Sequence, residues 1–142
     1  MPLSRIEIRR RATAFAKEWA DTSDEDAEAK SFWDGFFEVF GVPRKRVATF
    51  EHHVKKLDKA DGFIDLLWPG KLVVEHKSKG KSLDKACGQA MDYLHGLKDH
   101  ELPQYIISSD FARIRVHHLE TKAEQTIALA DLPKRTEAFD FI

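Results

Sequence analysis

Residues 62–77 read GFIDLLWPGKLVVEHK, and this stretch decides the fold. Two largely apolar runs, residues 62–68 and 72–77, flank the dipeptide Pro69-Gly70, which is typical of tight turns. Short apolar runs bounded by turn residues predict β-strands, and a connection this short predicts that the two strands pair as an antiparallel hairpin.

Charged side chains interrupt both apolar runs. Asp65 lies in the first predicted strand, and Glu75 and Lys77 lie in the second. Charged residues are seldom buried without a partner, so these three groups need compensation. Mg²⁺ prefers oxygen ligands and keeps several waters, which suits two carboxylates and a phosphate. The pattern predicts metal-dependent phosphodiester hydrolysis, in which the lysine positions water or offsets charge on phosphorus. The alternative is a buried structural ion network.

The length of the turn decides whether the three groups meet. Side chains alternate along a strand, so Glu75 and Lys77 share one face. Asp65 joins them only if it lies opposite Glu75, which requires an odd-length turn such as residues 69–71. A two-residue turn would pair Asp65 with Val74 and place Glu75 on the wrong face. We therefore predict a three-residue turn or a bulge.

The same spacing elsewhere in the chain lacks this context. Glu-x-Lys also begins at Glu28 and at Glu120, and Asp110 lies as far ahead of Glu120 as Asp65 lies ahead of Glu75. Asp110, however, follows two serines in a loop signal, and Glu28 falls on a predicted helix, where residues i and i+2 do not share a face. Only the hairpin places its two carboxylates on adjacent strands.

Three helices are predicted around the hairpin. Helical spacing of apolar residues predicts one helix over residues 5–20, capped by Ser4, and a capping box from Ser23 to Asp26 opens the second. Ser82 caps a third. The second helix carries an aromatic face that we interpret as core: Phe32, Trp33, Phe36, Phe37 and Phe40. The third carries the apolar residues Leu83, Ala86, Cys87, Ala90, Met91, Leu94 and Leu97.

Further strands are predicted over residues 47–54, 104–108 and 113–119, and residues 123–142 are expected to form a short strand or loop that leads elsewhere. The order is helix, helix, three strands, helix, two strands. It predicts an α/β fold with a mixed central sheet flanked by helices and preceded by N-terminal helices.

A second motif lies in the third predicted helix, where Gln89 and Tyr93 are four residues apart and share a side. A Gln-x-x-x-Tyr motif after the lysine strand resembles the RecB-like branch of the PD-(D/E)XK nucleases. The longer run, residues 62–86, is similar to the N-terminal nuclease domain of MmeI-like (type IIL) enzymes, which fuse restriction and adenine methylation in one chain. The resemblance covers about residues 30–110.

This resemblance implies a restriction-endonuclease-like fold and a Mg²⁺-dependent DNA endonuclease, with Mn²⁺ as a substitute ion. By that resemblance Asp65, Glu75 and the main-chain carbonyl of His76 bind the metal, and Lys77 is the catalytic lysine.

The resemblance also assigns supporting roles. Gln89 and Tyr93 would complete the catalytic group or touch DNA. A further acidic ligand is expected from the region before the hairpin, and we rank Glu51 ahead of Glu38.

The resemblance implies a modular protein that acts on double-stranded DNA. Residues 1–142 would form one nuclease domain, the N-terminal module of a larger protein with methyltransferase and target-recognition domains. These residues hold no Gly-rich cofactor loop and no Asn-Pro-Pro-Tyr motif, so we expect no S-adenosylmethionine site here. The alternative is a non-catalytic DNA-binding or assembly module that retains the fold.

Composition is compatible with these expectations. Residues 44–85 hold 11 Lys/Arg against 6 Asp/Glu, whereas the rest of the chain holds 12 against 18. This segment is therefore basic, which suits contact with phosphates, and the remainder of the chain is acidic. The single cysteine, Cys87, excludes a disulfide framework and a cysteine-rich zinc site, and we interpret it as a small core residue. We expect a cytoplasmic protein without a membrane span. The pairs His52-His53 and His117-His118 are interpreted as structural or surface residues, because neighbours on a strand point to opposite faces.

Overall fold

The computed structural model describes residues 3–142, except for the side chains of residues 25 and 26. Within this range, six strands form one sheet in the order β1 to β6. β3 and β4 run parallel and the other neighbours antiparallel, so the sheet is mixed, as predicted. The strands are β1 (Thr49–Lys55), β2 (Asp61–Trp68), β3 (Leu72–His76), β4 (Tyr105–Ser109), β5 (Arg113–His118) and β6 (Glu124–Ala128).

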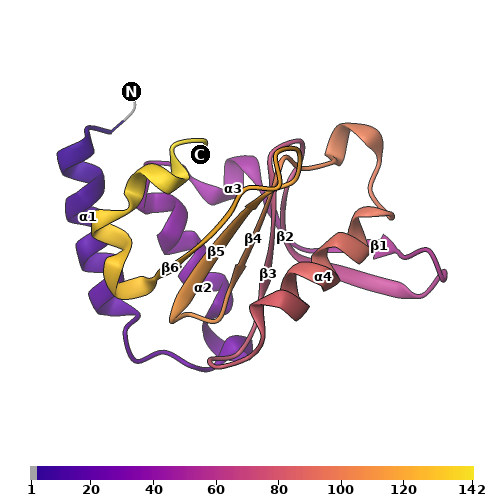
Figure 1. Cartoon of the computed structure of the whole chain (residues 1–142), viewed down its shortest axis with the longest axis horizontal. Helices are drawn as coiled ribbons and strands as arrows, with labels where there is room; N and C mark the ends of the chain where they lie inside the picture. Colours follow the sequence, from indigo (N-terminus) through magenta and orange to yellow (C-terminus); the bar gives the residue numbers. More distant parts are fainter. Residues whose placement is uncertain (1–2) are drawn as a thin grey trace.

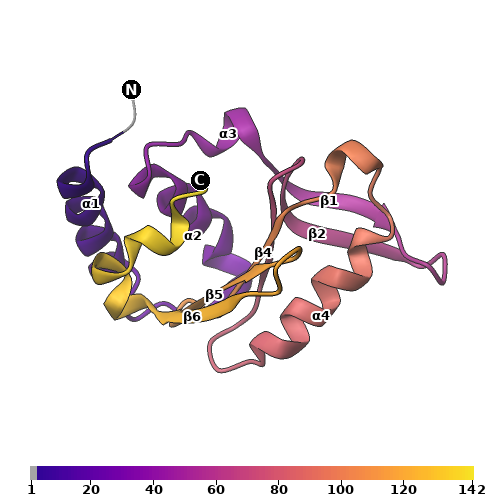
Figure 2. The ribbon, with the colours of Figure 1, turned by 45° about the horizontal axis from the view of Figure 1, so that its top comes forward.

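Helices cover both faces of the sheet (Figure 1). α4 (Leu83–Leu94) links the parallel strands β3 and β4 and lies on one face, since parallel neighbours need a crossover connection. α1, α2 and the C-terminal segment lie on the other face (Figure 2). The remaining bounds are α1 (Arg5–Glu18), α2 (Glu25–Val39), α3 (Arg44–Val47), η1 (Asp99–Glu101), η2 (Leu129–Lys134) and η3 (Thr136–Phe139). Across residues 3–142, no helix is long and apolar enough to span a membrane.

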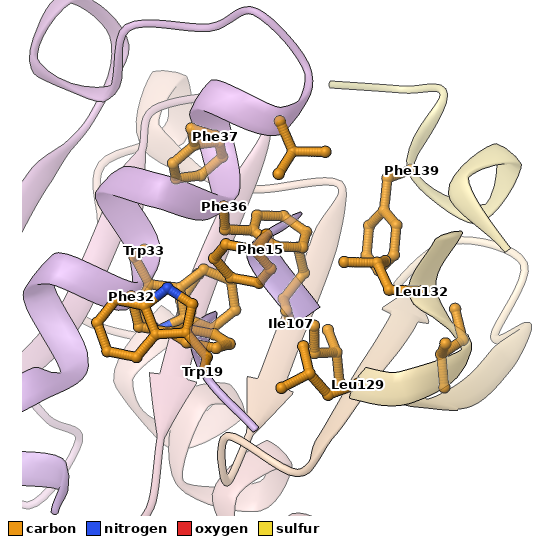
Figure 3. Close-up of a cluster of buried hydrophobic side chains, with 14 of the residues drawn as sticks. Phe15, Trp19, Phe32, Trp33, Phe36, Phe37, Ile107, Leu129, Leu132 and Phe139 are labelled. Atoms are coloured by element: carbon orange, nitrogen blue, oxygen red, sulfur yellow. The ribbon is translucent and has the colours of Figure 1, made fainter. Parts of the chain in front are cut away.

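An aromatic cluster fills the space between the sheet and α1 and α2 (Figure 3). The ring centroids of Phe15 and Phe32 lie 4.9 Å apart, and those of Phe32 and Trp33 lie 5.1 Å apart in an edge-to-face arrangement. Such contacts stabilise beyond the apolar area that they bury. The predicted aromatic face of the second helix is therefore confirmed as core, with Phe40 half-buried at its margin.

A smaller core lies under α4, where Cys87, Ala90 and Tyr93 pack with residues of β2, β3 and β4. Of the predicted stripe, Cys87 and Ala90 belong to this cluster, Leu83 and Ala86 are buried beside it, and Leu94 only packs against it. Met91 is exposed, and Leu97 lies beyond the end of the helix and only packs against the cluster.

Two of the three predicted helix caps are confirmed. Ser4 accepts a hydrogen bond from the Glu7 N–H, and Ser82 accepts one from the Lys85 N–H. The Ser23 cap is wrong by one residue, because the Asp24 carboxylate accepts from the Ala27 N–H and begins α2. The expected capping box also involves residue 26, whose side chain lies outside the part of the chain that the structure describes.

The strand predicted over residues 47–54 begins two residues later, at Thr49, because Val47 ends the short helix α3. Arg44 explains this: its guanidinium donates to the Asp34 carboxylate at 2.7 Å and to the Ala48 carbonyl at 3.0 Å, which folds the chain back on itself. The other predicted helix and strand ends differ by one or two residues, except that α4 ends three residues before Leu97, the last residue of its predicted stripe.

The prediction for residues 123–142 is wrong in part. β6 is the expected short strand, but the segment does not lead elsewhere. η2 and η3 return to α1 and bury Leu129, Leu132 and Phe139 in the aromatic cluster. The Arg5 guanidinium, at the start of α1, donates two hydrogen bonds to the Asp140 carboxylate, just after η3, at 2.8 and 2.6 Å.

The sheet is irregular where β1 and β2 pass each other at Glu51 and Asp65. The register is the same on either side, with Phe50 opposite Leu66 and His52 opposite Ile64, yet the intervening pair is absent from the ladder. Glu51 has a φ of 53°, in the left-handed region that such residues seldom adopt. Ile64 and Leu66 would share a face in a regular strand but lie in different cores, so β2 turns over at Asp65.

Candidate active site

The hairpin turn has the predicted length. Three residues, 69–71, connect β2 and β3, with Gly70 in the middle at a φ of 77°. Leu66 pairs with Val74, and the same register places Asp65 opposite Glu75. The ladder ends at this level, and the Asp65 Oδ2 atom instead accepts a hydrogen bond from the main-chain N–H of His76 at 2.7 Å.

Glu75 is a buried carboxylate with incomplete compensation. Its residue is 3% exposed, and its Oε2 atom has no hydrogen-bond partner. Its Oε1 atom lies 3.4 Å from the Lys77 Nζ atom. Burial, followed by the negative charge of Asp65, raises the pKa of Glu75 to about 8, and Lys77 offsets only part of this effect. The folded chain therefore disfavours two ionised carboxylates here unless a further positive charge is present.

These groups fit a divalent cation. The orphaned Oε2 atom of Glu75 and the nearby Asp65 carboxylate are oxygen ligands of the kind that Mg²⁺ takes. The Lys77 N–H points to β4, where it donates to the Ser109 carbonyl at 2.8 Å. In a trans peptide the carbonyl points opposite to the N–H, so the His76 carbonyl is directed toward β2 and Asp65.

Lys77 is held in place by α4, the third helix that the sequence predicts. Its Nζ atom donates to the Gln89 Oε1 atom at 2.5 Å, and the Gln89 Nε2 atom donates to the Tyr93 hydroxyl at 2.6 Å. The Tyr93 ring in turn packs on Gly62 of β2, where a Cβ atom would lie 2.7 Å from the ring. The sequence motif therefore forms one connected chain of contacts from α4 to Lys77.

The two candidates for an additional acidic group lie in different places. Glu51, opposite Asp65 in the register, lines a cavity of about 130 Å³ together with Lys30, Trp33, Asp65 and His76. Its Oε1 atom lies 3.3 Å from the Lys30 Nζ atom. Glu38 lies on the far part of α2, where its carbonyl accepts from Arg11 of α1. Only Glu51 is brought to the hairpin.

A basic cavity of about 430 Å³ adjoins Lys77. It is lined by Lys77, Lys81, Ser82, Lys85 and Gln89, with no carboxylate among these residues. The three ammonium groups and the first turn of α4 give this surface a positive potential suited to phosphate.

Comparison with known proteins identifies the family. The sequence matches the family described as "MmeI, N-terminal domain" over residues 10–142. The chain belongs to this family. The resemblance found in the sequence is thus confirmed. No curated protein matches the chain.

The fold of this MmeI N-terminal domain also has a solved relative. A chain in the cryo-electron microscopy structure of a DrdV–DNA complex is similar, with a TM-score of 0.61, 14% sequence identity and 91% of the present chain covered. The present chain spans 13% of the length of the DrdV chain. This likeness supports the nuclease-like fold that the sequence predicts.

Two features of this MmeI N-terminal domain were not found from the sequence. Asp110, interpreted as a loop residue, has a buried carboxylate that accepts from the Gly80 N–H at 3.0 Å and from the Arg113 N–H at 2.9 Å. It thereby fixes the loop after Lys77. The Trp33 indole donates to the His76 Nδ1 atom at 2.9 Å, and burial lowers the pKa of His76 to about 4. The Asp110–Gly80 and Trp33–His76 contacts have no local sequence signal, because each joins segments that are distant in the sequence.

Proposed function

We propose that this chain is a metal-dependent DNA endonuclease domain of the PD-(D/E)XK class. The observation that carries the proposal is the convergence of the Asp65 and Glu75 carboxylates with the Lys77 ammonium at the point where β2 and β3 separate. Membership of the MmeI family supports a restriction-enzyme module. We further propose that residues 1–142 act as its nuclease domain, joined in the full protein to methyltransferase and target-recognition domains.

In this proposal Asp65, Glu75 and the His76 carbonyl hold Mg²⁺, for which Mn²⁺ substitutes. The bound ion supplies polarisation of the phosphodiester and a lowered pKa for its water. Lys77, held by Gln89 and Glu75, places its charge beside the phosphate oxygens that gain charge in the transition state. Tyr93 restricts Gln89, and so keeps Lys77 in position.

Double-stranded DNA is the proposed substrate. The basic cavity beside Lys77 offers Lys81 and Lys85 to the phosphate backbone next to the reacting group. The DrdV relative was solved in complex with DNA, which supports the same class of ligand here.

Plasmid nicking tests this function. We expect Mg²⁺-dependent conversion of supercoiled plasmid to the nicked form, reduced roughly 100–1000-fold in Asp65→Ala and in Lys77→Ala. Glu120→Ala and Lys122→Gln are matched controls, because they alter the same sequence spacing away from the hairpin. Equal nicking by all variants would contradict the proposal.

Calorimetric titration with Mn²⁺ separates this function from a non-catalytic DNA-binding module. Binding that disappears in Glu75→Ala supports the nuclease, even if target recognition requires the remaining domains. A folded wild-type chain that binds no Mn²⁺ would favour the non-catalytic module instead.

Glu51 is proposed as the additional acidic group. We expect Glu51→Gln to weaken Mn²⁺ binding by roughly 10–100-fold, the range for groups that support a metal's direct ligands. Glu38→Gln is the matched control and should bind as wild type does. If the two variants bind Mn²⁺ equally well, Glu51 has no part in the metal site.

A further inference from the structure

A second group of side chains, of the types that can bind a metal, lies on the α4 face of the sheet, apart from the hairpin acids. One ligand atom each of Cys87, His117 and Glu124 can be chosen so that all three lie within 4.8 Å of one another. His117 and Glu124 are direct neighbours across the β5–β6 ladder, and Cys87 comes from α4, which packs on this face. Three separate elements of the fold therefore deliver three different donor types to one point.

One of these groups has a buried polar atom without a hydrogen bond. The His117 Nδ1 atom is buried without a hydrogen bond, and its separation from the Glu124 Oε1 atom is 3.5 Å. The Cys87 thiol belongs to a residue that is 7% exposed. Buried polar atoms are normally hydrogen-bonded, so an orphaned imidazole nitrogen facing a carboxylate calls for an explanation. A bound cation would satisfy the nitrogen and the carboxylate together.

The surrounding charges allow such a cation. Arg115 lies 3.8 Å from the Glu124 carboxylate, but its Nη1 atom is hydrogen-bonded to Asp84 at 2.5 Å, so its charge is already compensated. Burial, and then the negative charge of Glu124, raises the pKa of Cys87, with a smaller contribution from Asp84 and an opposing one from Arg115. A thiolate and a carboxylate together would neutralise a divalent ion.

We propose that Cys87, His117 and Glu124 bind one Zn²⁺ ion, with water as the fourth ligand. Zn²⁺ takes sulfur, imidazole nitrogen and carboxylate oxygen in tetrahedral sites, whereas Mg²⁺ binds oxygen. Ligand atoms around tetrahedral zinc lie roughly 3–4 Å apart, given bonds of about 2.0–2.3 Å. A rotation of the Glu124 side chain would shorten these separations, since this side chain is 43% exposed and is not fixed by core packing.

Zinc at this position would act on α4. Cys87 precedes Gln89 by two residues on the helix that holds Lys77. Binding would tie α4 to β5 and β6 and so restrict the helix that carries Gln89 and Tyr93. The site does not depend on the proposed nuclease function.

Cobalt spectroscopy tests the proposal. Titration of the reduced, metal-free chain with Co²⁺ should give thiolate-to-cobalt charge-transfer absorption and the intense visible bands of tetrahedral Co²⁺, and equimolar Zn²⁺ should abolish both. Zn²⁺ at about 100 times its Kd should raise the unfolding midpoint by roughly 5–10 °C.

Three variants locate the ion. Cys87→Ala should lose the charge-transfer absorption, and Glu124→Gln, an exposed change that leaves the core intact, should weaken Co²⁺ binding at least roughly 10-fold. Asp65→Asn should retain the whole spectrum. Absence of charge-transfer absorption in the folded wild type would overturn the proposal, as would a spectrum lost in Asp65→Asn but kept in Glu124→Gln.

Discussion

Replacing Glu75 by glutamine is expected to lower plasmid nicking by roughly 100–1000-fold and, without metal, to stabilise the fold. The two effects have one cause. The buried Glu75 carboxylate lies beside Asp65 with one oxygen unpartnered, so its ionised form is costly unless a cation binds. Glutamine has nearly the same shape but no charge. At pH 8 in a chelator, we expect the free energy of unfolding to rise by roughly 1–4 kcal/mol.

The pH dependence separates this explanation from a general packing effect. The pKa of Glu75 is raised from 4.5 to about 8 in the folded chain, so the native state keeps a proton that the unfolded state has lost. Wild-type stability therefore falls as pH rises through this window. The pKa of His76 is lowered from 6.5 to about 4, which makes stability fall as pH drops below 6.5. Between pH 6.5 and 8 only the Glu75 effect remains of these two.

Urea unfolding in a chelator between pH 6.5 and 8 measures the difference. The wild-type midpoint should fall with pH, and the Glu75→Gln midpoint should not. Mg²⁺ should restore the wild type and leave the variant unchanged, because only a ligand that binds the native state stabilises it. Parallel midpoints for the two proteins would show that Glu75 is not held in the protonated form.

Trp33→Ala is expected to lower the free energy of unfolding by roughly 3–5 kcal/mol, the range for large-to-small changes of buried aromatics. Trp33 is 1% exposed and packs edge-on against Phe32 and Phe36. Its removal also leaves the buried His76 Nδ1 atom without its donor. A loss of this size is a large part of the stability of an ordinary domain.

Trp33→Phe distinguishes the two contributions. Phenylalanine keeps most of the ring packing but cannot donate to His76, so we expect a smaller loss of roughly 1–3 kcal/mol. Urea midpoints of the two variants and the wild type provide the measurement. A loss below about 1 kcal/mol for Trp33→Ala would show that the Trp33 ring contributes little to the core.

The hairpin was predictable because its information is local. Pro69-Gly70 marks the turn, and the requirement that Asp65 lie opposite Glu75 fixes its length at three residues, as the structure has it. Helix caps at Ser4 and Ser82 were likewise readable from neighbouring residues.

The remaining features depend on contacts between distant segments. The turnover of β2 at Asp65 accompanies the left-handed backbone of Glu51, and no pattern within either strand signals it. Asp110 followed two serines and was correctly placed outside a strand, but its bond to Gly80, 30 residues earlier, required the fold to be known. Likewise, only the pairing of β1 with β2 shows that Glu51, and not Glu38, lies beside the hairpin.

The return of the C-terminal segment to α1 has a consequence during synthesis. Leu132 and Phe139 complete the aromatic cluster that begins with Ala12 and Phe15, so the first helix gains its last neighbours only at the end of translation of this domain. Until Phe139 leaves the ribosomal tunnel, the aromatic face of α2 stays incompletely covered and open to chaperones. Ribosome-bound chains halted before residue 129 should accordingly be more sensitive to protease than chains in which residues 1–142 are held clear of the tunnel by an added linker.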